Sequence, residues 1–142
     1  MKKKQVVLVP NGPPKPLYLS PAVRAGDFIF VSGNVGLLPG RPAYGEKGKD
    51  WMPGELISGG IAAETRQTLE NVKALLEAAG ATLDDVVKVN TLLRDIDRDF
   101  HAYNDVYMEY FKGDLPARTT VEAKIYNRTL VEIECVAYKP VA

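Results

Sequence analysis

Apolar residues recur at helical spacing over residues 61–79, which is the clearest structural signal in the chain. Positions three and four residues apart share one side of a helix, and the charged residues between them fall on the other sides. The recurring positions are Ile61, Thr65, Leu69, Val72, Leu76 and Ala79. Gly80 follows them and can adopt the left-handed backbone that ends many helices. The pattern predicts an amphipathic helix over 61–79.

Segments before and after this helix have the composition of strands and of a second helix. Residues 27–32 and 83–93 are rich in β-branched, aliphatic and aromatic side chains, so each predicts a strand. Asp97 or Asp99 can cap a further helix that ends before Gly113 and Pro116. That helix carries the aromatic residues Phe100, Tyr103, Tyr107 and Tyr110 or Phe111, which are expected in the core and interfaces.

Two segments are rich in proline and glycine. Residues 10–16 predict an extended arm or loop, because proline lacks an amide donor and resists helix formation. Residues 36–60 predict one long surface loop, which holds Tyr44 and Trp51. This loop could reshape a ligand cleft toward a larger or aromatic-like substrate, act as a lid, or serve as a packing appendage.

The C-terminal residues 117–125 and 129–138, around residues 126–128, predict a β-hairpin. Only a register that pairs odd-numbered with odd-numbered residues keeps the apolar rows of both strands together. These rows are Thr119, Val121, Ala123 and Ile125, and Val131, Ile133, Cys135 and Ala137. We therefore expect Arg118, Glu132 and Glu134 on one polar sheet face, with helices on the opposite face. Such charges are hard to bury unless another subunit closes over them.

Composition excludes several classes of function. The 142 residues suit one domain, 1–142, and the 18 Lys and Arg residues balance the 18 Asp and Glu residues. This balance gives no basic surface for nucleic acid. One His and one Cys cannot form a zinc cluster, and the short apolar run at residues 6–9 is too brief for a signal peptide or membrane span. A cytoplasmic location is expected.

Several motifs together resemble the Rid family (reactive intermediate/imine deaminases, also called the YjgF family). They are AVRAGDFIFVSG, ETRQTLENVKALLEAAGATLDDVVKVNTLLRDI, YNDVYMEYF, LPARTTVE and VEIECVA, in family order over nearly the whole chain. The resemblance implies an α+β, chorismate-mutase-like mixed sheet with two helices on one face. It also implies a homotrimer with ligand clefts between neighbouring subunits. Members that are enzymes hydrolyse enamines and imines, such as 2-aminoacrylate, to 2-keto acids and ammonia without a metal or cofactor.

The same resemblance assigns two catalytic candidates. Arg118, in LPARTT, matches the family arginine that binds the substrate carboxylate, and a guanidinium suits this task because it forms bidentate pairs. The alternative for Arg118 is an ion pair with Glu122 or Glu134. Glu132, in VEIE, matches the family glutamate assigned to proton transfer, and its alternative is a solvated strand residue. Glu134 is expected to be structural.

Further positions match the family's binding residues. Asn104 would line or brace the cleft, or else be a surface amide of the second helix. Ser32 and Gly33 would lie beneath the substrate, where glycine permits a close backbone approach, although Ser32 could instead form a strand-end turn. Backbone groups around Gly33 and Thr119 would hold the amino end of the substrate.

The chain also departs from the family pattern. A family tyrosine aligns with Leu19, so the neighbouring Tyr18 could contact substrate only if its loop shifts by one residue. The residue two after the family arginine, often cysteine, is Thr120, so thiol reactivity there should be missing. Cys135 is expected to be an inert core residue, and His101 to lie in solvent near a helix start.

The leading hypothesis is an enamine or imine deaminase, and three alternatives stay open. One is a dedicated catabolic deaminase, such as one for 2-aminomuconate. Another is a non-catalytic trimer that binds or senses 2-keto acids. The third, a ribonuclease or translation inhibitor, is disfavoured by the balanced charge, since it needs a phosphate-binding surface.

Overall fold

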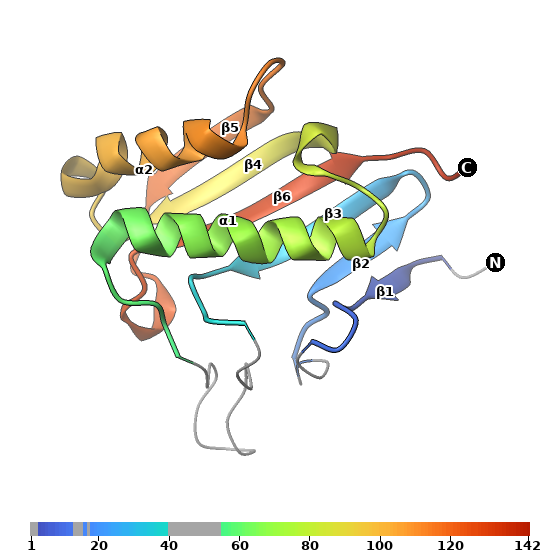
Figure 1. The fold of residues 1–142 in the computed structure, drawn as a ribbon, viewed down its shortest axis with the longest axis horizontal. Coiled ribbons are helices and arrows are strands. Elements are labelled where there is room, and N and C mark those ends of the chain that lie inside the picture. The colour runs from blue at the N-terminus through green and yellow to red at the C-terminus, as the bar shows by residue number, and fades with distance from the viewer. Residues whose placement is uncertain (1–2, 13–15, 17, 40–54) are drawn as a thin grey trace.

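The computed structural model describes residues 3–12, 16, 18–39 and 55–142. Six strands form one mixed sheet in the order β1-β2-β3-β6-β4-β5 (Figure 1). Neighbouring strands are antiparallel, except that β4 and β5 are parallel. The strands are β1 (Gln5–Val7), β2 (Ala22–Ala25), β3 (Phe28–Asn34), β4 (Val86–Leu93), β5 (Ala117–Glu122) and β6 (Val131–Tyr138).

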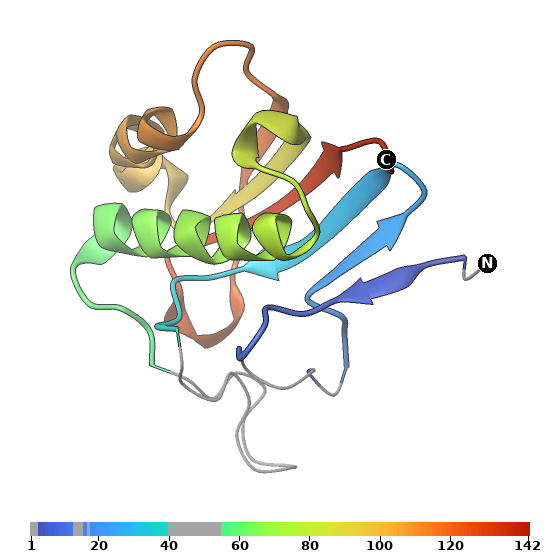
Figure 2. The ribbon, with the colours of Figure 1, turned by 45° about the vertical axis from the view of Figure 1, so that its right-hand side comes forward.

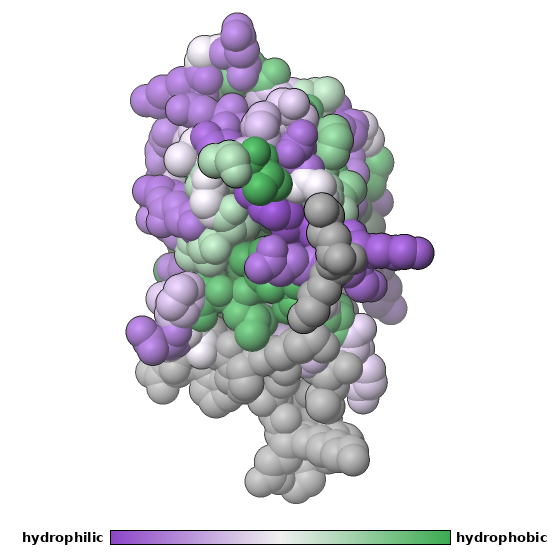
Figure 3. Space-filling model, turned by 90° about the vertical axis from the view of Figure 1, so that its right-hand side faces the viewer, coloured by the Kyte–Doolittle hydropathy of each residue, from purple (hydrophilic) through white to green (hydrophobic). Residues whose placement is uncertain are grey.

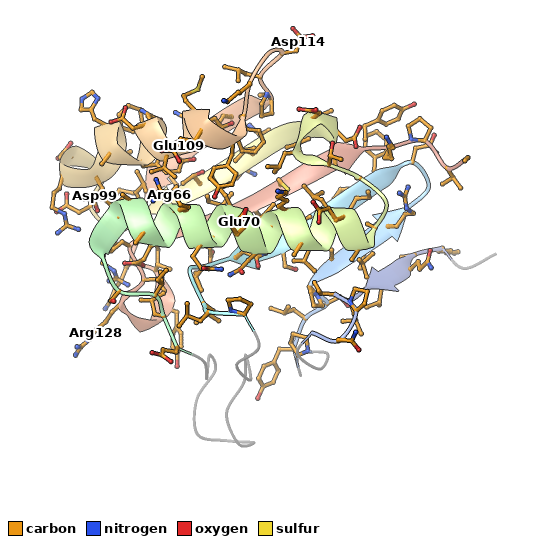
Figure 4. All side chains as sticks on the ribbon, in the orientation of Figure 1. Arg66, Glu70, Asp99, Glu109, Asp114 and Arg128 are labelled. Atoms are coloured by element: carbon orange, nitrogen blue, oxygen red, sulfur yellow. The ribbon has the colours of Figure 1, made fainter. Side chains whose placement is uncertain are left out.

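Two α-helices, α1 (Gly60–Ala78) and α2 (Ile96–Tyr110), lie side by side on one face of this sheet (Figure 2). The described residues place no helix on the other face, which is called the open face below. Arg66 of α1 and Glu109 of α2 form an ion pair of 3.1 Å across the helix interface (Figure 4). The predicted α+β class, with a mixed sheet and two helices on one face, is confirmed.

The helix predicted over 61–79 is α1, and Gly80 after it has φ +83°, as a left-handed stop requires. The predicted cap of the second helix is wrong. The carboxylate of Asp95 accepts a hydrogen bond from the Arg98 amide at 3.1 Å, so α2 begins earlier than either Asp97 or Asp99 predicts. Asp99 is buried and forms an ion pair with Arg98 at 2.8 Å.

The predicted strand at 27–32 corresponds to β3, and that at 83–93 to β4, preceded by a 3₁₀ turn at Leu83–Asp85. Strands β2 and β3 form a hairpin that is not among the predicted pairs of strands. Ala25 pairs with Phe28 across a two-residue turn, and Gly26 has the positive φ of 59° that such turns require.

The hydrophobic core lies between the sheet and the two helices. Strand β6 shows the alternation most clearly, since its residues are alternately buried and exposed or half-buried along its whole length. The predicted apolar row of this strand is confirmed as its buried side: Val131, Ile133, Cys135 and Ala137. None of the helices in the described residues is long and apolar enough to span a membrane.

The predicted C-terminal hairpin is wrong, because β5 does not pair with β6. Strand β4 lies between them, parallel to β5 and antiparallel to β6. Helix α2 connects β4 to β5, and a crossover helix of this kind makes the two strands it joins parallel. The chain then returns through a 3₁₀ turn at Tyr126–Arg128 to place β6 on the other side of β4.

The open face carries exposed aromatic residues near one end of the sheet. The rings of Phe28 and Tyr138 lie 5.3 Å apart, and those of Phe28 and Phe30 lie 6.5 Å apart. All three side chains are more than two-fifths exposed. The side of the molecule that carries both chain ends likewise shows hydrophobic patches among hydrophilic residues (Figure 3).

Candidate functional site

Arg118 lies on β5 and its side chain packs against α2. Its Nη1 donates a hydrogen bond to Oδ1 of Asn104 at 2.8 Å. The guanidinium carbon lies 4.7 Å from the ring centroid of Tyr107, 5.4 Å from that of Tyr103 and 5.9 Å from that of Phe100. The electron-rich faces of these rings stabilise the cation without neutralising it.

The ion-pair alternative for Arg118 is not what the structure shows. Glu122 accepts a hydrogen bond from the Ile96 amide at 3.1 Å, and Glu134 accepts one from Asn90 at 3.3 Å. Among the described residues, no carboxylate forms an ion pair with Arg118. Its guanidinium is therefore half-buried, held by an amide and rings, and still able to bind an anion.

Asn104 shares a helix face with the three rings. Positions 103 and 104 lie three and four residues after 100, and position 107 lies three and four residues after them, so all four project to the same side of α2. The sequence predicts these aromatic residues in the core and interfaces, and it is compatible with Asn104 either as a cleft residue or as a surface amide. The helical spacing was the signal that could have grouped Phe100, Tyr103 and Tyr107 with Asn104.

Glu132 lies on β6 and its side chain covers Gly33 of the neighbouring strand β3. A Cβ atom built on Gly33 would come within 2.9 Å of Glu132 Cδ and 3.0 Å of its Oε2. The missing side chain of Gly33 therefore accommodates a protein carboxyl, while the substrate contact expected at Gly33 stays a prediction. Ser32 uses its hydroxyl to donate to the Ser20 carbonyl at 2.6 Å, which ties β3 to the segment before β2.

The electrostatic surroundings of Glu132 favour its protonated form. Burial raises the pKa of Glu132, and the negative charge of Glu134 raises it further. Described residues supply no hydrogen-bond donor to its carboxyl. A half-buried carboxyl without a protein donor is suited to exchange a proton with a water or a ligand.

Arg118 and Glu132 project from opposite faces of the sheet, so the prediction that they share one face is wrong. In the observed register, Arg118 is aligned with Val89 and Cys135 on the helix-covered face. Glu132 is aligned with Leu92 and Val121 on the open face, and Glu134 lies on that face with Asn90. The interposed β4 sets this register, whereas the expected hairpin would have put even-numbered residues of both strands together.

Two further predicted site residues lie on β5, on opposite sides of it. Thr119 is exposed on the open face, where its hydroxyl accepts a hydrogen bond from Lys88 Nζ at 3.0 Å. Thr120 is aligned with the buried Thr91, and its Oγ1 is buried without a hydrogen-bond partner in the described part of the chain. The apolar row predicted to include Thr119 and Val121 is therefore the less buried side of this strand.

The other residues singled out in the sequence lie in the N-terminal loop, in the 36–60 segment, on α2 and on β6. Tyr18 is 74% exposed, while Leu19 beside it is half-buried. Tyr44 and Trp51 fall outside the described residues, although Leu37 and Leu56 form a bridge within the two described ends of the 36–60 segment. His101 is exposed and Cys135 is buried, as expected, and burial raises the pKa of the Cys135 thiol to about 12.

A metal centre in the described ranges would need a cluster of ligand side chains. These ranges contain no group of three or more His, Cys, Asp or Glu side chains that could hold a metal ion. The described residues instead form two separate clusters of functional side chains: on the helix-covered face, the Arg118 guanidinium with Asn104 and the rings of α2, and on the open face, the Glu132 carboxyl over Gly33.

Comparison with known sequences gives one family for most of the chain. The profile of the family described as endoribonuclease L-PSP matches residues 13–139. A RutC family protein of Pyrococcus horikoshii is 42% identical over 138 residues, which cover 96% of this chain and 98% of that protein. The 2-iminobutanoate/2-iminopropanoate deaminase of Homo sapiens is 38% identical over 119 residues, or 83% of this chain and 77% of that one.

Solved structures show the same fold. The crystal structure of RidA from an Antarctic Psychrobacter species superposes with a TM-score of 0.77 at 32% sequence identity. The match covers 94% of this chain and 98% of that one.

Proposed function

The chain belongs to the endoribonuclease L-PSP family, the family of the Rid proteins, and on that premise we propose that it is an enamine/imine deaminase. Its substrates would be small acids of the 2-aminoacrylate and 2-iminopropionate type, and its products a 2-keto acid and ammonia. The human relative named as an imine deaminase supports this reaction class. The observation that carries the proposal is the half-buried Arg118, which hydrogen-bonds Asn104 and pairs with no described carboxylate.

Arg118 would bind the substrate carboxylate. Two parallel N–H···O bonds from a guanidinium fix both the position and the plane of a carboxylate. In this role Asn104 orients the guanidinium through Nη1, and the rings of α2 support one of its faces. The substrate would thereby be held with its α-carbon at a defined place.

Glu132 would move the protons of the reaction. The enamine CH₂=C(NH₂)COO⁻ takes a proton at its terminal carbon and becomes the protonated imine, CH₃–C(=NH₂⁺)COO⁻. Water then adds to the imine carbon, and the resulting carbinolamine loses ammonia to give the 2-keto acid. A carboxyl whose pKa is raised by burial can donate the first proton and accept one from the attacking water. The net reaction consumes one water and requires no oxidation or reduction, so we propose that it proceeds without a cofactor or metal.

The remaining residues would complete the cleft. Backbone groups around Gly33 and Thr119 would hold the amino end of the substrate, Ser32 would lie beneath the substrate with Gly33, and Thr120 would complete the binding residues. Tyr18, which is exposed in the segment before β2, would contact the substrate if its loop shifts by one residue. The cytoplasmic location inferred from the sequence stays a prediction.

The site would be shared between two copies of the chain. Because Arg118 and Glu132 lie on opposite faces of the sheet, a ligand bound to Arg118 of one copy is separated by the sheet from Glu132 of the same copy. A second copy that docks its open face beside β5 would bring its own Glu132 toward that ligand. The exposed Phe28, Phe30 and Tyr138 supply apolar surface on this open face. We propose a homotrimer with three such clefts.

A direct test is turnover of freshly generated 2-iminopropionate by the purified protein. We expect release of ammonia and pyruvate above the spontaneous rate, and loss of turnover with retained pyruvate binding in Glu132→Gln. Pyruvate binding without turnover in the unaltered protein would overturn the proposal in favour of a sensor. Activity on 2-aminomuconate but not on 2-iminopropionate would identify the dedicated catabolic deaminase instead.

A further inference from the structure

Two buried hydroxyl groups bond to each other beside Arg118. Tyr103 of α2 and Thr91 of β4 are both fully buried, and their oxygen atoms lie 2.5 Å apart. Burying two hydroxyl groups in the core costs free energy unless they form a hydrogen bond. The strength of that bond depends on the exact positions of the two side chains. None of the roles assigned to the site above uses this pair.

The pair joins the helix and the strand that support Arg118 from two sides. Thr91 lies two residues along β4 from Val89, which is aligned with Arg118. The Tyr103 ring lies 5.4 Å from the guanidinium carbon, and its position in α2 precedes Asn104, which accepts from Arg118. The hydrogen bond therefore fixes the tilt of a ring in direct contact with the cation.

The electrostatics of Tyr103 are consistent with a neutral, hydrogen-bonded hydroxyl at this place. Burial raises the pKa of Tyr103, while the bond to Thr91 and both the charge of Arg118 and a hydrogen bond with it act in the opposite direction. The hydroxyl stays protonated at neutral pH, so it can hydrogen-bond Thr91 without placing a negative charge beside Arg118.

We propose that the Thr91–Tyr103 hydrogen bond is a positioning device that holds the Arg118 guanidinium in the orientation in which it binds a substrate carboxylate. Tyr103 and Thr91 are positioning residues in this account, since they act through Arg118. The inference rests on the proposed function only for the identity of the ligand. The hydrogen bond should affect substrate affinity more than the rate of the chemical step. Arg118 would hold the carboxylate equally in the ground state and in the transition state.

The sharpest test compares Tyr103→Phe/Thr91→Val with the unaltered protein. Replacing both partners of a buried hydrogen bond by apolar groups of the same shape can leave stability nearly unchanged. The double variant is therefore expected to fold with a similar Tm. We expect its KM to rise about three- to tenfold with kcat within about twofold, as uniform loss of binding requires. Tyr103→Phe alone provides a second variant if the double variant is unstable.

The matched control is Tyr110→Phe. It removes a tyrosine hydroxyl from the same helix, where that hydroxyl donates to the Arg66 carbonyl at 3.4 Å, remote from Arg118 in the contacts described. We expect no change in KM for this variant. An equal rise in KM for Tyr110→Phe and Tyr103→Phe would assign the effect to general loosening of α2 and overturn the inference.

Two readouts that require no turnover separate this inference from the proposed function. The first is the Kd for 2-oxobutanoate from calorimetry, and the second is the NMR order parameter of the Arg118 Nε–H bond. We expect the Kd to rise by the same factor as KM and the order parameter to fall toward the range of flexible groups. If neither changes in the double variant, the inference is wrong. If both change while the unaltered protein shows no deaminase turnover, the inference stands and the proposed function fails.

Discussion

The carboxyl group of Glu132 lies against the backbone of Gly33, so that a Cβ atom on residue 33 would approach Glu132 Cδ to 2.9 Å. The two residues come from adjacent antiparallel strands, β3 and β6, near an irregularity in their pairing. The position of the proposed proton-transfer group therefore depends on the absence of one methyl group.

Gly33→Ala is expected to displace the Glu132 carboxyl and reduce kcat by about tenfold or more, because proton transfer requires hydrogen-bond distance. Unfolding measurements provide the control. Gly33→Ala should destabilise the protein when Glu132 is present, and should have little effect in a Glu132→Ala background, where the obstructing carboxyl is gone. An equal loss of stability in both backgrounds would contradict the contact.

Glu134→Gln is expected to shift the acid limb of the pH profile of kcat/KM to lower pH. With 2-iminopropionate as substrate, Glu132 has to accept a proton from the attacking water, so its deprotonated form is the active one. Burial and the charge of Glu134 both raise the pKa of Glu132, so the unaltered protein should lose activity on this imine, as pH falls, at a pH above the ordinary glutamate range. Removing the negative neighbour lowers the pKa of Glu132, and the active form then persists to lower pH. An unchanged or upward-shifted acid limb would exclude Glu132 as the titrating group.

Asn104→Asp is expected to raise KM at least about tenfold, because it places a carboxylate at the atom that accepts from Arg118 Nη1. The new ion pair would compete with the substrate carboxylate for the guanidinium. The matched control is Asp105→Asn, which changes charge at the next, exposed position of α2. A similar KM in both variants would show that Arg118 does not bind the substrate carboxylate.

Asp95→Ala is expected to lower the free energy of unfolding by about 1 kcal/mol, since its side chain caps the α2 amide of Arg98. Asp97→Ala, two residues later and exposed, should change it by less than about 0.5 kcal/mol. Denaturant titration of both variants distinguishes the observed cap from the one that the sequence alone suggested. The reverse order of effects would contradict the cap assignment.

Local patterns predicted the local structure well. The helix α1 and the buried row of β6 follow from spacing within single segments, and such spacing is fixed by backbone geometry. The cap of α2 was misassigned because Asp95, Asp97 and Asp99 have similar capping chemistry, and only the path of the chain selects among them.

Pairing between distant segments could not be predicted in the same way. The alternation in β5 and β6 is equally compatible with a direct hairpin and with β4 inserted between them, yet the two arrangements place Arg118 on different faces. The motifs identified Arg118 and Glu132 as site candidates, whereas their separation by the sheet follows only from the fold. The hydrogen bond between Tyr103 and Thr91 beside Arg118 could not be predicted from the sequence either, because it joins residues of two separate elements.

The central claim, that one site uses Arg118 of one copy and Glu132 of another, is tested most directly with mixed oligomers. Arg118→Ala and Glu132→Gln chains carrying different tags are co-expressed, and the hybrids are isolated by both tags in turn. In a trimer with clefts between neighbours, one cleft of three in every hybrid regains both residues, so we predict about one third of the unaltered activity. Hybrids no more active than the two parent variants would contradict a site shared between copies.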